Sequence, residues 1–232
     1  MPLDAPALPV SLVVAGRRCL VVGGGPVALR KASALCEAGA ALTAVAPSFV
    51  EGFLELPARL HRRPYQPGEA ASYRLVVAAT GRREVDRQVS ADAEAAGVLV
   101  NAVDDPASCS LIWPAVLRRG CVTVAVSTGG ASPALASWLR DRIAALVGPE
   151  TAVLAELVGA ARRAVHEAGS STEGLDWPAA IATAEGALAE GGTEAAARAL
   201  ARWVTAALGP TGSGGPAGPD GGARQGGTPG GG

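Results

Sequence analysis

Aromatic residues are scarce in this chain, making up 3% of its 232 residues. Proteins that bind single-stranded nucleic acid use aromatic side chains as stacking platforms for the bases. The chain also lacks a basic surplus, because 20 Lys and Arg oppose 21 Asp and Glu and give a net charge of −1. Binding of a phosphate backbone needs such a surplus. Both absences argue against nucleic acid as a partner.

Long apolar runs and paired cysteines are absent too. No uninterrupted run approaches the roughly 20 residues that a membrane helix needs. No basic stretch precedes the first apolar residues, as it would in a secretory signal. The four cysteines form no CxxC pair and have no histidine at zinc-ligand spacing: Cys19, Cys36, Cys109 and Cys121. We therefore expect no membrane contact, no metal site, and a cytoplasmic protein with reduced thiols.

Short apolar runs alternate with helical patterns in the first half of the chain. The apolar runs lie at 19–22, 42–45, 60–63, 75–79 and 98–103. Helical spacing of small and apolar residues follows the first run, and a second helix is expected over 84–96. Continuous apolar strands alternating with helices predict a parallel sheet covered on both faces. We expect a Rossmann-type α/β domain over residues 1–109.

The pattern changes over residues 110–149. Two extended runs, 110–117 and 121–127, are joined by Arg118–Gly120, which predicts an antiparallel hairpin. Ser132 and Pro133 then read as the N-cap and first turn of a helix. Its expected buried stripe consists of Leu135, Leu139, Ile143 and Leu146. Such a small hairpin-plus-helix unit lacks a core of its own, so we expect a dimerisation region and a homodimer.

The remaining chain is rich in alanine and then in glycine. Helical segments are expected at 151–168, 178–190 and 194–208, forming a helical C-terminal domain over residues 150–208. About half of residues 209–232 are glycine, mixed with Pro, Ser and Thr. Such a composition buries too little apolar surface to offset chain entropy, so a disordered tail is expected there.

A glycine turn follows the first apolar run. The residues Gly23, Gly24, Gly25, Pro26, Val27 and Ala28 have the form G-x-G-x-x-A between a strand and a helix. Glycine permits the tight turn and lets a pyrophosphate approach the backbone, while the helix N-terminus offers amide donors. A purely structural turn is the alternative. In this context we interpret the turn as a dinucleotide site.

The second strand lacks the carboxylate that ordinarily holds the adenine ribose. It ends at Pro47 and Ser48, where only the serine hydroxyl offers a hydrogen bond. No basic residue stands beside it in the sequence to meet the 2′-phosphate of NADP, which favours NAD. Thr80, after the fourth strand, is the remaining residue expected to bind the cofactor.

Three motifs in order carry a resemblance: GGGPVALRK, NAVDDP and AVSTGGASP. They are similar to the siroheme synthase N-terminal family, the precorrin-2 dehydrogenases, over roughly residues 8–147. The resemblance implies NAD-dependent dehydrogenation of precorrin-2 to sirohydrochlorin in siroheme biosynthesis, with iron insertion by a sirohydrochlorin ferrochelatase activity in some members. It also implies a Rossmann domain, a dimerisation region and a helical domain in a homodimer.

The family's carboxylate corresponds to Asp104. From spacing alone, Asp104 and Asp105 fit a simple turn before Pro106 equally well. The resemblance favours a catalytic role for Asp104, whose carboxylate can take a proton as hydride leaves, and leaves Asp105 as a turn residue. A tetrapyrrole rich in carboxylates needs cations in its cleft, and six basic residues lie in or near the motif segments: Arg30, Lys31, Arg118, Arg119, Arg140 and Arg142. The alternative is that these side chains only cover solvated helix faces.

The sequence departs from the family pattern in places. Gly81 and Asp86 differ from the residues common near the cofactor cleft, and Thr128 stands where some relatives carry a modifiable serine. Thr128 is either a regulatory site or a small polar loop residue. Two other functions remain open: another small NAD-dependent dehydrogenase, and a non-catalytic dinucleotide-sensing regulatory domain. The first needs a catalytic His, Lys or Tyr in the second half, and the second leaves Asp104 unexplained.

Overall fold

A computed structural model describes residues 7–209, which form two compact units. The first unit holds the residues up to Arg118 together with Thr123–Val147, and the second holds Arg119–Val122 and the residues from Gly148 onward. The expected disordered tail lies, apart from Gly209, outside the described residues. Each unit is considered by itself.

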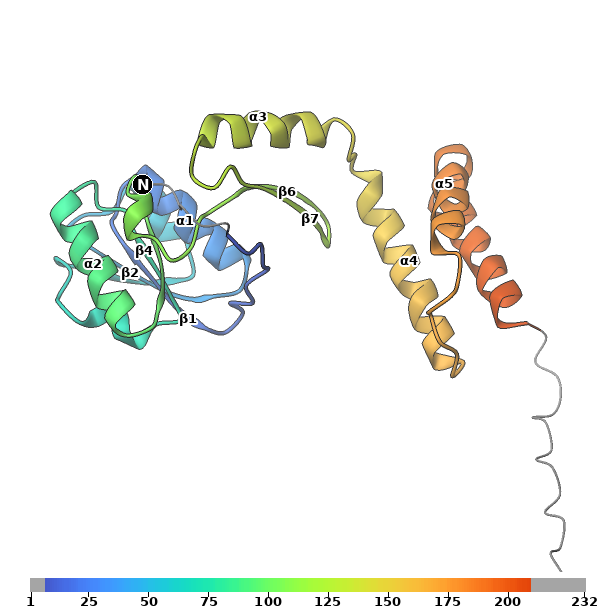
Figure 1. The fold of residues 1–232 in the computed structure, drawn as a ribbon, viewed down its shortest axis with the longest axis horizontal. Helices are drawn as coiled ribbons and strands as arrows, with labels where there is room; N and C mark the ends of the chain where they lie inside the picture. The colour runs from blue at the N-terminus through green and yellow to red at the C-terminus, as the bar shows by residue number, and fades with distance from the viewer. Residues whose placement is uncertain (1–6, 210–232) are drawn as a thin grey trace, which may run out of the picture. The chain divides into compact units, whose positions relative to one another are not determined.

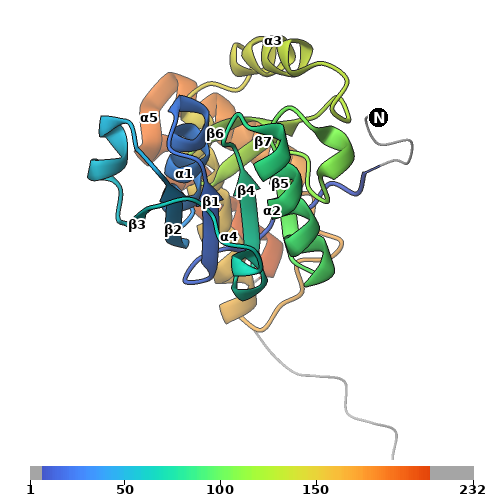
Figure 2. The same cartoon turned by 90° about the vertical axis from the view of Figure 1, so that its left-hand side faces the viewer.

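A five-stranded parallel sheet forms the centre of the first unit (Figures 1 and 2). The strand order is β3-β2-β1-β4-β5, with every neighbouring pair parallel. This confirms the expected Rossmann-type α/β architecture. The strands are β1 (Arg18–Val22), β2 (Ala41–Ala46), β3 (Ala58–Arg62), β4 (Leu75–Ala78) and β5 (Leu99–Ala102).

Helices cover both faces of this sheet because alternate strand residues point to opposite sides. Cys19 and Val21 of β1 pack in the cluster that includes α1 (Pro26–Glu37). Leu20 and Val22 pack in the cluster that includes α2 (Arg83–Ala95). All four β1 side chains are at most 1% exposed, which explains why the run is apolar without alternation. Short 3-10 turns complete the connections: η1 (Glu51–Glu55), η2 (Glu69–Ser72) and η3 (Pro106–Ser108).

The hairpin is shorter than expected at its start. It consists of β6 (Ala115–Arg119) and β7 (Val122–Val126), joined at Gly120 and Cys121. The expected strand at 110–117 was therefore wrong over its first five residues. Ser110 and Leu111 instead donate their backbone N–H groups to Val100 of β5, both at 3.0 Å. Arg118 and Arg119 lie in the strand rather than in the turn.

Helix α3 (Pro133–Ala144) begins as expected but does not bury its stripe. The Ser132 hydroxyl accepts a hydrogen bond from the Leu135 N–H at 3.2 Å, which confirms the N-cap. Leu135 is 46% exposed and Leu146, beyond the helix end, is 86% exposed. The expectation of a buried stripe is wrong within one chain, because only Ala136 of this helix is buried.

The second unit packs α4 (Glu150–Glu167) against α5 (Trp177–Leu208). Gly192 interrupts α5 with φ 69° and ψ −169°, so α5 comprises two helices, as the separate segments at 178–190 and 194–208 predicted. Trp177 and Trp203 pack against each other with ring centroids 4.7 Å apart. Among the described residues, no helix has the length and hydropathy to cross a membrane.

Candidate functional site

The carboxyl ends of the parallel strands bring four loops to one edge of the sheet. The register aligns Val22 of β1 with Val45 of β2 and with Ala78 of β4, which in turn pairs with Ala102 of β5. The chain leaves β1 toward β2 and later returns on the other side through β4. This reversal creates the crevice in which open α/β sheets bind ligands.

The first two glycines of the turn are required by the loops on either side. Gly23 has a φ of +129°, and a Cβ there would overlap the backbone carbonyl of Ala79. A Cβ on Gly24 would overlap the carbonyl of Ser48, in the loop after β2. Gly24 also accepts a hydrogen bond from the Val50 N–H at 2.9 Å. The turn is thus packed between the loops that follow β2 and β4.

Gly25 faces open space instead, since nothing lies within 4 Å of a Cβ built there. It occupies the N-cap of α1 without any side-chain cap, and Pro26 follows at the first helical position. The first amides of a helix have no intrahelical acceptor and carry the positive end of its dipole. Gly25, Val27 and the helix start therefore form a cradle that fits a pyrophosphate.

Thr80 is held beside this turn by a residue that sequence reasoning noted only as a departure. Its backbone N–H and its hydroxyl both donate to Oδ1 of Asp86, at 3.0 and 2.8 Å. Asp86 is 6% exposed and lies in the first turn of α2. Its carboxylate therefore fixes the loop after β4. Nothing in the local sequence indicated this contact, because Thr80 and Asp86 meet only through the fold.

The loop after β2 gains a cation that its own sequence lacks. Arg62, the last residue of β3, places its guanidinium 5.7 Å from the ring centroid of Phe49. Phe49 directly follows Ser48, which is exposed at the sheet edge. The sequence-based view that no basic residue stands near this loop holds for chain neighbours, and the fold brings one in from the adjacent strand.

Asp104 stands in a strained turn after β5. Its φ of 61° is the only positive value at a non-glycine residue between residues 7 and 209. Its side chain is exposed and makes no hydrogen bond or ion pair with the described residues. Such a conformation costs roughly 1–3 kcal/mol and persists only where neighbours hold it. The carboxylate is thus available to a ligand at the same sheet edge as the glycine turn.

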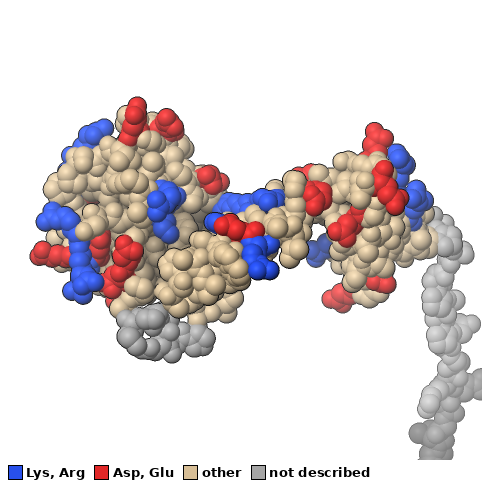
Figure 3. Space-filling view, turned by 90° about the horizontal axis from the view of Figure 1, so that it is seen from above, with Lys and Arg blue, Asp and Glu red and all other residues tan. Residues whose placement is uncertain are grey.

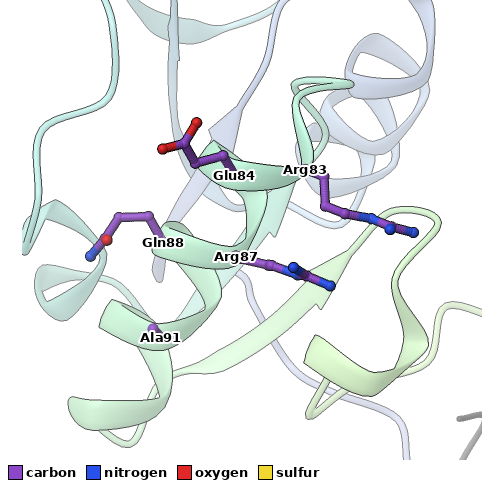
Figure 4. A pocket seen from close by; sticks show the side chains of 5 residues that line it. All are labelled: Arg83, Glu84, Arg87, Gln88 and Ala91. Atoms are coloured by element: carbon purple, nitrogen blue, oxygen red, sulfur yellow. The ribbon is translucent and has the colours of Figure 1, made fainter.

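Asp105 fastens this turn to its surroundings. Its Oδ2 accepts a hydrogen bond from the Ser108 hydroxyl at 3.0 Å and lies 3.5 Å from Nε of Arg87. Figure 4 shows Arg87 and Arg83 extending from the same side of α2. The Arg87 side chain is 61% exposed, so the ion pair itself contributes little stability. Asp105 therefore holds in place the turn that contains Asp104.

Cys109 holds the same turn from the other side. Its sulfur lies 3.1 Å from the Ala102 N–H, 3.2 Å from the Ala102 carbonyl and 3.4 Å from the Asp105 carbonyl. Burial is the main cause that raises the pKa of this thiol, so it stays protonated and donates. Sequence reasoning missed this role, because a single cysteine carries no pattern that reveals it.

The expected cations divide into several groups. Arg30 and Lys31 of α1 line a cavity of about 350 Å³. Arg140 pairs with Asp141 at 2.7 Å, and Arg142 lies over the Trp138 ring at 4.9 Å. Arg118 and Arg119 lie in β6. Among residues 7–209, no cluster of three His, Cys, Asp or Glu side chains is placed to hold a metal ion.

Thr128 has a structural task in the loop before α3. Its hydroxyl donates to the Ser132 carbonyl at 3.1 Å and accepts from the Ser132 N–H at 3.0 Å. These bonds support the view of Thr128 as a small polar loop residue. A regulatory role stays a prediction.

Comparison with known proteins matches two family models. Residues 10–115 match the model described as putative NAD(P)-binding, and residues 119–146 match that of the sirohaem biosynthesis protein central region. The siroheme synthase of Methylococcus capsulatus is 41% identical over 165 residues, covering 69% of this chain and 35% of that protein. The siroheme synthase of Chromobacterium violaceum is 42% identical over 200 residues, covering 82% of this chain and 42% of that protein.

The chain thus spans less than half the length of these curated relatives. A solved structure described as SirC, precorrin-2 dehydrogenase, superposes with a TM-score of 0.63 at 22% identity. The superposition covers 85% of this chain and 98% of that chain, which shows that the two proteins share a fold. Over residues 10–146 the chain therefore belongs to the siroheme synthase N-terminal family.

Proposed function

We propose that this protein catalyses the NAD-dependent dehydrogenation of precorrin-2 to sirohydrochlorin. The observation that carries this proposal is the meeting of two features at one sheet edge. An open glycine cradle suited to a pyrophosphate and a strained, unpartnered carboxylate both lie where the parallel strands end. The relatives named siroheme synthase and the neighbour named precorrin-2 dehydrogenase support the same assignment.

In this reaction a hydride and a proton leave the reduced tetrapyrrole together. NAD+, when bound, supplies the hydride acceptor. The Asp104 carboxylate takes the proton from the substrate and later releases it to water, which balances the reaction as substrate plus NAD+ giving product, NADH and H+. Cys109 and Asp105 keep the Asp104 turn in place, and Asp86 keeps Thr80 beside the glycine turn.

NAD is the proposed cofactor because the β2 loop offers Ser48 and no carboxylate or phosphate-binding cluster of its own. Arg62 is a cation that the fold brings close to this loop, where it stacks on Phe49. A comparison of the dissociation constants of NAD+ and NADP+ tests the choice. Tighter binding of NADP+, lost in Arg62→Ala, would overturn it.

A homodimer and a cytoplasmic location belong to the same proposal. The exposed apolar side chains of the α3 region, Leu135, Trp138 and Leu146, support pairing with a second copy. All four cysteines are free thiols, which agrees with a reducing compartment. Ferrochelatase activity, implied by the resemblance for some relatives, stays a prediction.

Anaerobic incubation of the full chain with precorrin-2 and NAD+ tests the proposed activity. The expected result is the absorbance of sirohydrochlorin together with one NADH per turnover. Binding of NADH without any change in the tetrapyrrole spectrum would instead indicate the dinucleotide-sensing function and overturn the enzymatic one.

A further inference from the structure

A cavity of about 350 Å³ lies within the first unit, apart from the glycine turn. Its walls come from α1, from the segment before β6, and from the loop and helix that follow β7. This volume is at the lower end of the range for ligand sites. The cavity therefore suits a side arm of a large molecule better than a whole macrocycle.

Two neighbouring cations line this cavity without neutralising partners. Arg30 and Lys31 both contribute to its walls, and neither forms an ion pair with any of residues 7–209. Lys31 is partly buried, and its ammonium lies 4.4 Å from the centroid of the Trp113 ring. Arg30 is exposed, so the cost falls on Lys31: holding its partly desolvated charge beside a second cation disfavours folding unless an anion joins them.

The polar groups around the cations are suited to carboxylate oxygens. The cavity is also lined by the hydroxyl-bearing Ser127 and Ser137 and by Gly130. Hydroxyls and cations together bind carboxylates by charge-assisted hydrogen bonds. Acidic side chains, in contrast, are absent from its lining.

Lys31 also connects the cavity with the Asp104 turn. Its ammonium lies within electrostatic range of the Cys109 thiol, which contacts Ala102 and the Asp105 carbonyl. Along α1, Lys31 is five residues beyond Pro26, or about 8 Å from the pyrophosphate cradle. A ligand arm held by Lys31 thus leaves the rest of the molecule close to both halves of the proposed active site.

We propose that this cavity binds the carboxylate side arms of the tetrapyrrole, with Arg30 and Lys31 as its specificity-determining cations. The inference rests on the proposed function for the identity of the ligand. On the face drawn in Figure 3, basic and acidic side chains are interspersed, so this face presents no separate cationic patch. Cations placed in the site itself can then supply the recognition of a polyanion.

Carboxylate binding in the cavity is expected to depend on pH through the protonation of Lys31. Burial, followed by repulsion from Arg30, lowers the pKa of Lys31 to about 8. The other titratable group facing it is the Cys109 thiol, whose pKa is raised by burial. A bound carboxylate stabilises the ammonium, so it raises the pKa of Lys31 and is itself bound less tightly above pH 8.

Lys31 is the only lysine in the sequence, beside 19 arginines, which makes its side chain selectively observable. The full chain, labelled with ¹³C and ¹⁵N at lysine, is titrated with uroporphyrin, a stable porphyrin bearing carboxylate arms. A cationic N-methylpyridyl porphyrin is the control. We expect the Lys31 signal to shift and its pKa to rise with uroporphyrin alone. A Lys31 signal unchanged at saturating uroporphyrin would overturn the proposal.

Variants separate charge from packing. Lys31→Gln and Arg30→Gln are each expected to weaken uroporphyrin binding by about ten- to a hundredfold, the scale of a charged hydrogen bond. Lys31→Arg is expected to keep the affinity for uroporphyrin. In this variant the affinity is also expected to stay constant between pH 7 and 9, where that of the wild type falls. Arg17→Gln, just before β1 at the opposite edge of the sheet, is the control and is expected to bind normally.

The outcomes also distinguish this inference from the proposed function. If wild-type protein oxidises precorrin-2 and Lys31→Gln does so with an unchanged KM, the cavity assignment is wrong and the activity stands. If uroporphyrin shifts the Lys31 signal and no dehydrogenation occurs, the activity is wrong and the cavity stands. A circular dichroism spectrum and melting temperature for each variant ensure that lost binding is not lost folding.

Discussion

Asp104 and Lys31 each lower the stability of the folded chain in the absence of a ligand. Asp104 adopts a left-handed backbone conformation, and Lys31 keeps a cation in a partly buried cavity beside Arg30. Both lie close to the edge or cavity where ligands are proposed to bind. Groups of this kind persist at functional sites, where the ligand compensates for the cost.

Replacing Lys31 by methionine is expected to stabilise the protein at pH 7. Because folding lowers the pKa of Lys31 to about 8, the unfolded chain binds more protons between pH 8 and the ordinary lysine pKa. The loss of folding stability caused by the Lys31 charge is therefore at its full size below pH 8 and disappears as the pH rises through that interval. Lys31→Met removes it, for a gain of about 1 kcal/mol after loss of the Trp113 contact.

Urea unfolding of both proteins at pH 7 and pH 10 measures this difference. The two free energies of unfolding are expected to differ at pH 7 and to converge toward pH 10. Equal stabilities at pH 7, or a gap that widens with pH, would show that Lys31 is not held at a cost.

The glycine turn could be predicted from the sequence because it is a local pattern, whereas residues that act through tertiary contacts could not be predicted. Gly23, Gly24 and Gly25 form one contiguous turn whose spacing reflects its geometry, so the sequence predicted them together. Asp86 and Cys109 act on groups six or seven residues away across a loop, at atoms that only the folded chain brings together. No periodicity encodes such contacts.

At the scale of elements, the N-terminus of α1 is left without a side-chain cap, so its first amides stay available to a ligand. Its N-cap is Gly25, which offers no side-chain acceptor to the free amides of the first turn. An N-cap Asp or Ser would satisfy one of these amides. The extended φ of −86° at Gly25 suits any residue, so glycine is not required there by the backbone.

Gly25→Asp is therefore expected to separate stability from cofactor binding. The new carboxylate caps α1 and interacts with its dipole, which raises the free energy of unfolding by about 0.5 kcal/mol. The same charge repels a pyrophosphate, so calorimetry is expected to detect no NAD+ binding. Gly25→Ala is the matched variant without charge and retains weaker binding. Unchanged NAD+ affinity in Gly25→Asp would place the cofactor elsewhere.

The regular elements of the sheet could be predicted because β1, β2 and β4 are buried on both faces, while α1 and α2 each bury one face. The hairpin start could not, since Ser110 and Leu111 pair with Val100 rather than with the partner strand. The stripe of α3 was recognised as apolar, yet Leu135 and Leu146 are exposed in the single chain, and the apolar pattern alone does not reveal this.

For the whole molecule, the exposed apolar side chains of the α3 region lead to the proposed homodimer. Leu135, Trp138 and Leu146 are 46%, 53% and 86% exposed in the single chain. Leu135→Asp is expected to give a monomer by light scattering at micromolar concentration, because a charge cannot be buried unpaired at an apolar interface. Arg198→Asp, on the exposed surface of α5, is the control. A wild-type monomer would contradict the proposal.

If Asp104 accepts a proton beside the cofactor, Asp104→Asn removes this base from the reaction. Asparagine tolerates the left-handed conformation, so the turn is kept while the base is removed. Asp105→Asn is the matched control, since an amide oxygen still accepts the Ser108 hydroxyl. Both variants are compared with wild type in anaerobic turnover of precorrin-2 with NAD+, and in NAD+ binding by calorimetry. We expect Asp104→Asn to bind NAD+ normally and to turn over at least about a hundredfold more slowly, and Asp105→Asn to be close to wild type. Full turnover by Asp104→Asn would show that Asp104 is not the proton acceptor.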